Sequence, residues 1–142
     1  MVELLTGLIG GLVATIIMTV FMMALGDDSP PPTAIFWAKY IGDGDPKEYL
    51  PQGMVLHLIY GISAGGAFAV GVPLIDFVDV ESLEMAVFWG LAYGVILFVV
   101  AAILWMKVVL QIEPEKKMVG LFLLFHLIYG LVLGGWIGLE IF

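Results

Sequence analysis

Four long apolar stretches follow one another along the chain, with short polar segments between them. They cover about residues 4–25, 51–72, 83–109 and 118–141. Each is at least as long as the roughly 20 residues that a helix needs to cross the hydrocarbon core of a bilayer. The pattern predicts an all-α, polytopic membrane protein in which residues 1–142 form a single bundle of four transmembrane helices.

A shorter segment between the first two stretches mixes aromatic and polar residues. Three prolines at 30–32 lead into it and Gly42 follows it, which predicts a short helix over about residues 32–41. This helix is too short to span and contains Phe36, Trp37 and Tyr40. We therefore expect it to lie at the membrane interface with its aromatic rings at headgroup level. A vestibule for a lipid or a quinone is the alternative role.

The composition agrees with a membrane protein and excludes several kinds of chemistry. The chain is 62% hydrophobic and 13% charged, whereas soluble domains carry about 25% charged residues. Its net charge of −8 argues against a nucleic-acid partner and leaves the lipid bilayer as the expected one. Because cysteine is absent, disulfides and cysteine-bound metals are excluded. The acidic connections are typical of halophilic proteins.

The placement of lysine predicts the orientation in the cell membrane. All five positive charges are lysines, and they lie in or beside the first and third connections: Lys39, Lys47, Lys107, Lys116 and Lys117. By the positive-inside rule, loops 26–51 and 110–117 are expected on the cytoplasmic side and both termini outside. No basic segment or cleavage signal precedes the first stretch, so we expect it to be a retained helix.

Glycines spaced by four residues recur in the first and third stretches. Gly7 and Gly11 form one such pair, and Gly90 and Gly94 form the other. Small residues at this spacing let two helices approach closely. The face in the first stretch predicts packing within the bundle or, alternatively, a dimer contact. Because two such faces exceed what one bundle must bury, we also expect a homo-oligomer.

One ten-residue pattern occurs twice. Residues 57–66 read His-Leu-Ile-Tyr-Gly-Ile-Ser-Ala-Gly-Gly and residues 126–135 read His-Leu-Ile-Tyr-Gly-Leu-Val-Leu-Gly-Gly, with seven of the ten positions identical. The copies contain both histidines of the chain and lie in the second and fourth stretches, which run parallel. We therefore expect these two helices to pair about a pseudo-two-fold axis, with His57 and His126 facing each other at one depth.

The most specific hypothesis for this motif is bis-histidine ligation of haem. Two histidines at equal depth can each supply an axial imidazole to the haem iron, and neighbouring glycines leave room for the macrocycle. Without cysteine the cofactor would be haem b, and the function would be electron transfer. The candidate cofactor-binding set is His57, Tyr60, Gly61, His126, Tyr129 and Gly130.

Two other functions stay open. In a structural scaffold, the histidine and tyrosine of each copy would lock the helix packing through interhelical hydrogen bonds. In a small oligomeric transporter or channel, the histidine pair would line a polar path and titrate near neutral pH. Enzyme chemistry finds little support, because Ser63 has no base within reach by helix geometry and no nucleotide-binding glycine pattern occurs.

Several short motifs resemble those of a family of small, uncharacterised four-helix integral membrane proteins common in haloarchaea. The resemblance rests on residues 11–15 with Met18 and Thr19, on Pro31 and Pro32 with residues 37–39, and on the repeated His-Leu-Ile-Tyr-Gly at 57–61 and 126–130. It implies the four-helix architecture and no established activity.

Overall fold

The computed structural model describes residues 4–140, and it confirms the predicted fold class. Four helical spans in this range are long and apolar enough to cross a membrane, and a short helix lies between the first two. The predicted end of the last span, residue 141, lies outside the described range, and the helix ends at Gly138. The helices are α1 (Leu4–Leu25), α2 (Pro32–Tyr40), η1 (Pro46–Tyr49), α3 (Leu50–Gly71), η2 (Val72–Leu74), α4 (Leu83–Val100), η3 (Ala101–Leu110) and α5 (Lys116–Gly138).

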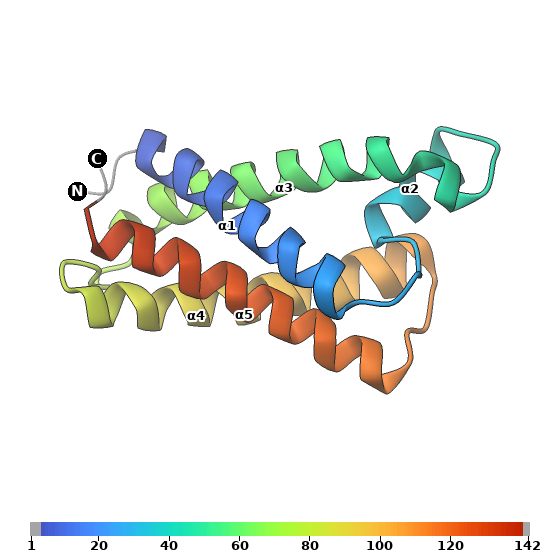
Figure 1. Ribbon diagram of the computed structural model, residues 1–142. Helices are drawn as coiled ribbons and strands as arrows, with labels where there is room; N and C mark the ends of the chain where they lie inside the picture. The colour runs from blue at the N-terminus through green and yellow to red at the C-terminus, as the bar shows by residue number, and fades with distance from the viewer. Residues whose placement is uncertain (1–3, 141–142) are drawn as a thin grey trace.

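The spans run alternately up and down as two helical hairpins (Figure 1). The first hairpin consists of α1 and α3, and the second consists of α4, continued by η3, and α5. The start of α1, the end of α5 and the α3–α4 connection lie at one end of the bundle, and α2 lies at the other. We call these the terminal end and the α2 end.

Glycines hold the first hairpin together. Gly7 and Gly11 of α1 lie directly against Gly61 and Gly65 of α3, so that a Cβ atom added at Gly11 would lie 2.6 Å from the Gly61 carbonyl oxygen. Thr15 extends this face by one more turn. Its hydroxyl donates a hydrogen bond to the carbonyl of Gly11 at 2.6 Å, which removes the cost of burying it. The small face of α1 is therefore used within the chain.

The second hairpin repeats this contact with equivalent residues. Gly90 of α4 lies against Gly130 and Gly134 of α5, where an added Cβ would lie 2.8 Å from the Gly134 Cα. Gly130 and Gly134 occupy the same motif positions as Gly61 and Gly65. Gly94 lies against the backbone of His126. Both hairpins thus use the motif glycines for close helix packing.

The expectation that the two motif helices pair with each other was therefore wrong. Each motif helix packs against the other helix of its own hairpin, because its glycine face offers the closest approach to another backbone. The small faces that suggested a homo-oligomer are filled in the same way. The homo-oligomer itself stays a prediction.

The two hairpins meet mainly through α1 and α5. Gly10 of α1 lies against Leu133 and Trp136 of α5, and Ala14 and Leu133 are fully buried. Among residues 4–140 the backbones of α3 and α4 are not closely packed. The hydroxyl of Tyr93 on α4 reaches across and donates to the Ala64 carbonyl of α3 at 2.8 Å. The bundle is therefore tightly packed on the side of α1 and α5 and looser on the side of α3 and α4.

Helix α2 fills part of the looser side. It packs on α3 and on η3 at the α2 end of the bundle (Figure 1). Lys39 Nζ donates to the Leu110 carbonyl at 3.0 Å, and the Tyr40 hydroxyl donates to the Val109 carbonyl at 2.6 Å. Carbonyls at the end of a helix have no partner within the helix, so these bonds fasten α2 to the end of η3.

Candidate functional site

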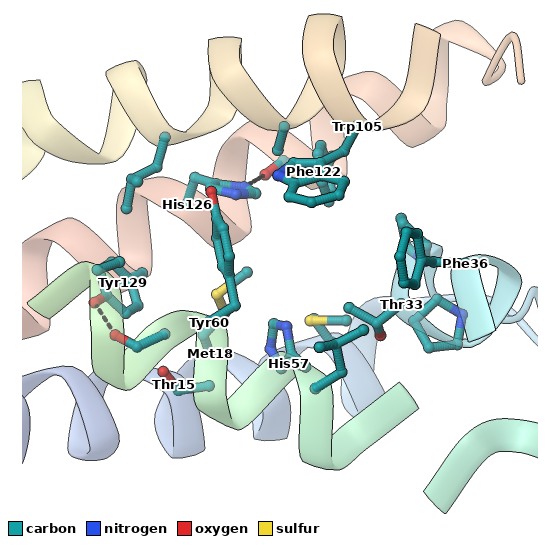
Figure 2. A pocket seen from close by; sticks show the side chains of 18 of the residues that line it. Thr15, Met18, Thr33, Phe36, His57, Tyr60, Trp105, Phe122, His126 and Tyr129 are labelled. Carbon is teal, nitrogen blue, oxygen red and sulfur yellow. Dashed lines mark hydrogen bonds between the residues drawn. The ribbon is translucent and has the colours of Figure 1, made fainter. Parts of the chain in front are cut away.

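A cavity of about 190 Å³ lies inside the bundle toward its α2 end (Figure 2). All four spans and α2 contribute to its wall, and none of the lining residues is Asp, Glu or Lys. Most of the lining is apolar, with Met18 and Leu97 beside the rings of Phe36, Trp105 and Phe122. An apolar cavity with a few placed polar groups is the usual form of a small-molecule site.

Five of the six candidate site residues lie on this wall. His57, Tyr60 and Gly61 come from α3, and His126 and Tyr129 come from α5. The sixth, Gly130, contacts Gly90 and Gly94 of α4. The structure thus brings both histidines and both motif tyrosines to one cavity, although their helices do not pair.

In the second copy of the motif, both polar side chains are bonded to backbone. His126 Nδ1 donates to the Phe122 carbonyl at 2.7 Å, because a carbonyl can only accept, and the side chain is 5% exposed. In a neutral ring this leaves Nε2 as an acceptor. The Tyr129 hydroxyl donates to the Gly61 carbonyl at 2.7 Å. The tyrosine of this copy therefore joins α5 to α3, whereas its histidine bonds within α5.

In the first copy, the histidine and the tyrosine lie on the cavity wall and make no such bond to any backbone carbonyl that the structure describes. His57 Nε2 is buried and has no hydrogen-bond partner among residues 4–140. Tyr60 lies with its ring edge-on to Trp105, at a centroid distance of 6.4 Å, and points toward His126 in Figure 2. Two nearly identical motifs thus have different surroundings, and the difference is at the cavity.

Thr33 of α2 provides a second unsatisfied group on the cavity wall. Its Oγ1 is buried and, within the part of the chain that the structure describes, is also without a partner. Thr33 was not among the candidate site residues predicted from the sequence. The only available signal was a hydroxyl residue directly after three prolines, at the start of a helix expected to lie at the interface.

The third span changes from α-helix to π-helix where it borders the cavity. The π segment η3 contributes Ala101, Trp105 and Leu110 to the wall. Its wider turns place Trp105 edge-on to Phe36, at a centroid distance of 5.9 Å, as well as to Tyr60. Segments of π-helix are rare and occur frequently at functional sites. Hydrophobic patterning does not separate π from α, so this feature was missed.

The cavity does not fit a haem. A cavity of about 150 Å³ holds a single benzene ring, and this one is only slightly larger, whereas a porphyrin joins four pyrrole rings. Moreover, the glycines expected to make room are in contact with other helices, Gly61 with Thr15 and Gly130 with Gly90. No group of three or more His, Asp or Glu side chains within residues 4–140 is placed to hold a metal ion directly.

Comparisons of this chain with protein-family models, with curated proteins and with solved structures found no match. The resemblance to haloarchaeal four-helix proteins therefore stays a prediction from short motifs.

Proposed function

We propose that this protein is a membrane-embedded binding protein for a small lipid-soluble ligand, with His57 recognising a polar group of that ligand. One observation carries the proposal: His57 Nε2 is buried on the wall of an apolar cavity with no partner among residues 4–140. A buried polar atom without a hydrogen bond costs about 1–3 kcal/mol. Such atoms are rare in native proteins and call for an explanation.

The second copy of the motif supports this interpretation. His126 occupies the position equivalent to His57 and is hydrogen-bonded to the carbonyl four residues before it. The motif thus permits a satisfied histidine, and the first copy differs because its buried Nε2 has no hydrogen-bond partner among residues 4–140. A ligand that bonds to Nε2 would remove the cost in the same way.

The size and lining of the cavity define the ligand further. About 190 Å³ suits one ring or a short branched chain. The mostly apolar wall favours a molecule that partitions into the bilayer, and the histidine favours one with an oxygen or nitrogen on it. The lysine distribution supports an orientation in which the α2 end, and with it the cavity, lies toward the cytoplasm.

Phenol and benzene test the proposal, because they share a ring and differ by one hydroxyl. Each is titrated calorimetrically into the protein in lipid nanodiscs. We expect phenol to bind roughly five- to tenfold more tightly, since one hydrogen bond contributes about 1 kcal/mol. His57→Leu should abolish this preference. The matched control is Ser63→Ala on the exposed face of the same helix, which should keep it. A preference that survives His57→Leu, or no binding of either probe, would sink the proposal.

A further inference from the structure

The cavity offers hydrogen-bonding groups on two facing walls. On the side of α3 and α2 lie His57 Nε2 and Thr33 Oγ1, both buried and, within residues 4–140, both unpartnered. On the side of α5 lies His126, toward which the Tyr60 side chain points (Figure 2). Since the Nδ1–H of a neutral His126 is used by the Phe122 carbonyl, its Nε2 can only accept, so the hydrogen-bond donor on this side of the cavity is the Tyr60 hydroxyl. A ligand with a single oxygen satisfies only one of the two walls.

Aromatic rings surround the space between these walls. Phe36 and Trp105 meet edge to face at 5.9 Å, Tyr60 and Trp105 at 6.4 Å, and Phe122 lies edge to face with His126 at 4.5 Å. Edges and faces of aromatic side chains pack well against another flat ring. The lining therefore favours a planar ring over a branched aliphatic chain, because a branched chain packs less closely against the aromatic side chains.

The cavity is only partly enclosed. Its wall includes Met22 near the end of α1 and Leu110 at the end of η3, beside the α2 segment. Because the cavity is not closed all round, a bound ring can carry a hydrocarbon chain that extends out of it. The remaining requirement is a ring that carries an oxygen at each of two opposite positions.

We infer that the ligand is a lipid quinone, a planar ring with two carbonyl oxygens in para positions and a hydrocarbon tail. This inference rests on the proposed function and names the ligand class of the same site. One carbonyl accepts from both His57 and Thr33, since its oxygen has two lone pairs, and the other accepts from the Tyr60 hydroxyl. Both oxygens are acceptors only, and all three side chains can donate.

Three probes with the same substituted ring test the inference. Duroquinone carries two oxygens, 2,3,5,6-tetramethylphenol carries one and durene carries none. Calorimetric titration into nanodisc-embedded protein should give affinities that rise at each step by roughly five- to tenfold, one hydrogen bond at a time. Tyr60→Phe should remove the step from one oxygen to two. His57→Leu should lower duroquinone affinity by a similar factor, and exposed Ser63→Ala should change nothing.

The outcomes separate the inference from the proposed function. If tetramethylphenol binds as tightly as duroquinone and still depends on His57, the quinone inference is overturned and the proposed function stands. If all three probes bind equally and His57→Leu has no effect, both are overturned. Should His57→Leu not fold, Thr33→Val replaces it as the variant of the same wall. The affinity difference between tetramethylphenol and duroquinone, and its loss in Tyr60→Phe, still decides the inference.

Discussion

The hydroxyl of Tyr129 donates a hydrogen bond to the carbonyl oxygen of Gly61 at 2.7 Å. These residues are the tyrosine of the second motif and the glycine of the first, so the two copies are joined directly although their helices do not pair. Tyr129 is 3% exposed and lies in the core. The equivalent tyrosine of the first copy, Tyr60, points into the cavity instead (Figure 2).

Removing the Tyr129 hydroxyl should therefore destabilise the bundle. We expect Tyr129→Phe to lower the free energy of unfolding by about 0.6–1.7 kcal/mol, the range for interhelical hydrogen bonds in membranes. Tyr60→Phe is the matched variant at the equivalent position and should lose less. The measurement is reversible unfolding of the detergent-solubilised protein with increasing denaturing detergent. Equal losses in the two variants would show that the copies are structurally interchangeable.

The glycine contacts predict which substitutions the bundle tolerates. An alanine methyl at Gly90 would meet the Gly130 carbonyl and lie 2.8 Å from the Gly134 Cα, so the two backbones must separate. We expect Gly90→Ala to cost about 1–3 kcal/mol. At Gly135 an added Cβ has no atom of residues 4–140 within 4 Å, apart from its own helix backbone and chain neighbours. Gly135→Ala should be neutral or slightly stabilising because alanine favours helix. The same unfolding assay measures both, and a destabilised Gly135→Ala would contradict the packing described.

The attachment of α2 to η3 should control the mobility of α2. Lys39→Met and Tyr40→Phe together remove the bonds to the carbonyls of Val109 and Leu110. We expect faster amide hydrogen exchange in residues 32–40, by roughly five- to tenfold, because local opening loses about 1 kcal/mol of stabilisation. Lys47→Met, at an exposed residue of η1, is the control and should leave exchange in α2 unchanged. Unchanged exchange in the double variant would mean that packing alone holds α2.

The orientation can be tested with single cysteines, because the chain has none of its own. Asp79→Cys lies in the α3–α4 connection and Asp43→Cys in the loop after α2, at opposite ends of the bundle, and both residues are exposed. With the lysine-rich loops inside, a membrane-impermeant maleimide should label Asp79→Cys in intact cells. It should label Asp43→Cys only after permeabilisation. The reverse pattern would invert the topology.

The size of the cavity predicts that the protein does not bind haem. Protein purified in mild detergent from haem-supplied cells should show no Soret band, oxidised or reduced with dithionite. The reason is steric, since about 190 Å³ holds a single ring system and not a porphyrin. A stoichiometric Soret band that disappears in His57→Leu and in His126→Leu would show that the cavity opens much further than its described form. Bis-histidine ligation would then replace the proposed function.

Local sequence determined the four spans and the short helix between the first two, because the length of an apolar stretch and its flanking prolines and glycines are short-range properties. In lipid, a single stretch of about 20 apolar residues can satisfy its own backbone hydrogen bonds only as a helix. The three prolines followed by aromatic residues predicted the start of a short helix. Glycines at a spacing of four showed that close helix packing would occur. His57 and His126 were recognisable as candidates because ionisable groups inside an apolar span are costly.

Only the tertiary structure decided which faces meet. All the small faces offer a similar close approach, so nothing local indicated that Gly11 would face Gly61 and Gly65, or that Gly90 would face Gly130 and Gly134. For the same reason the identical segments at 57–61 and 126–130 acquired different roles. Tyr129 donates to a carbonyl of α3, whereas His57 Nε2, on the cavity wall, has no hydrogen-bond partner among residues 4–140. A cavity is what remains when distant segments have packed, and no single stretch of the chain encodes it.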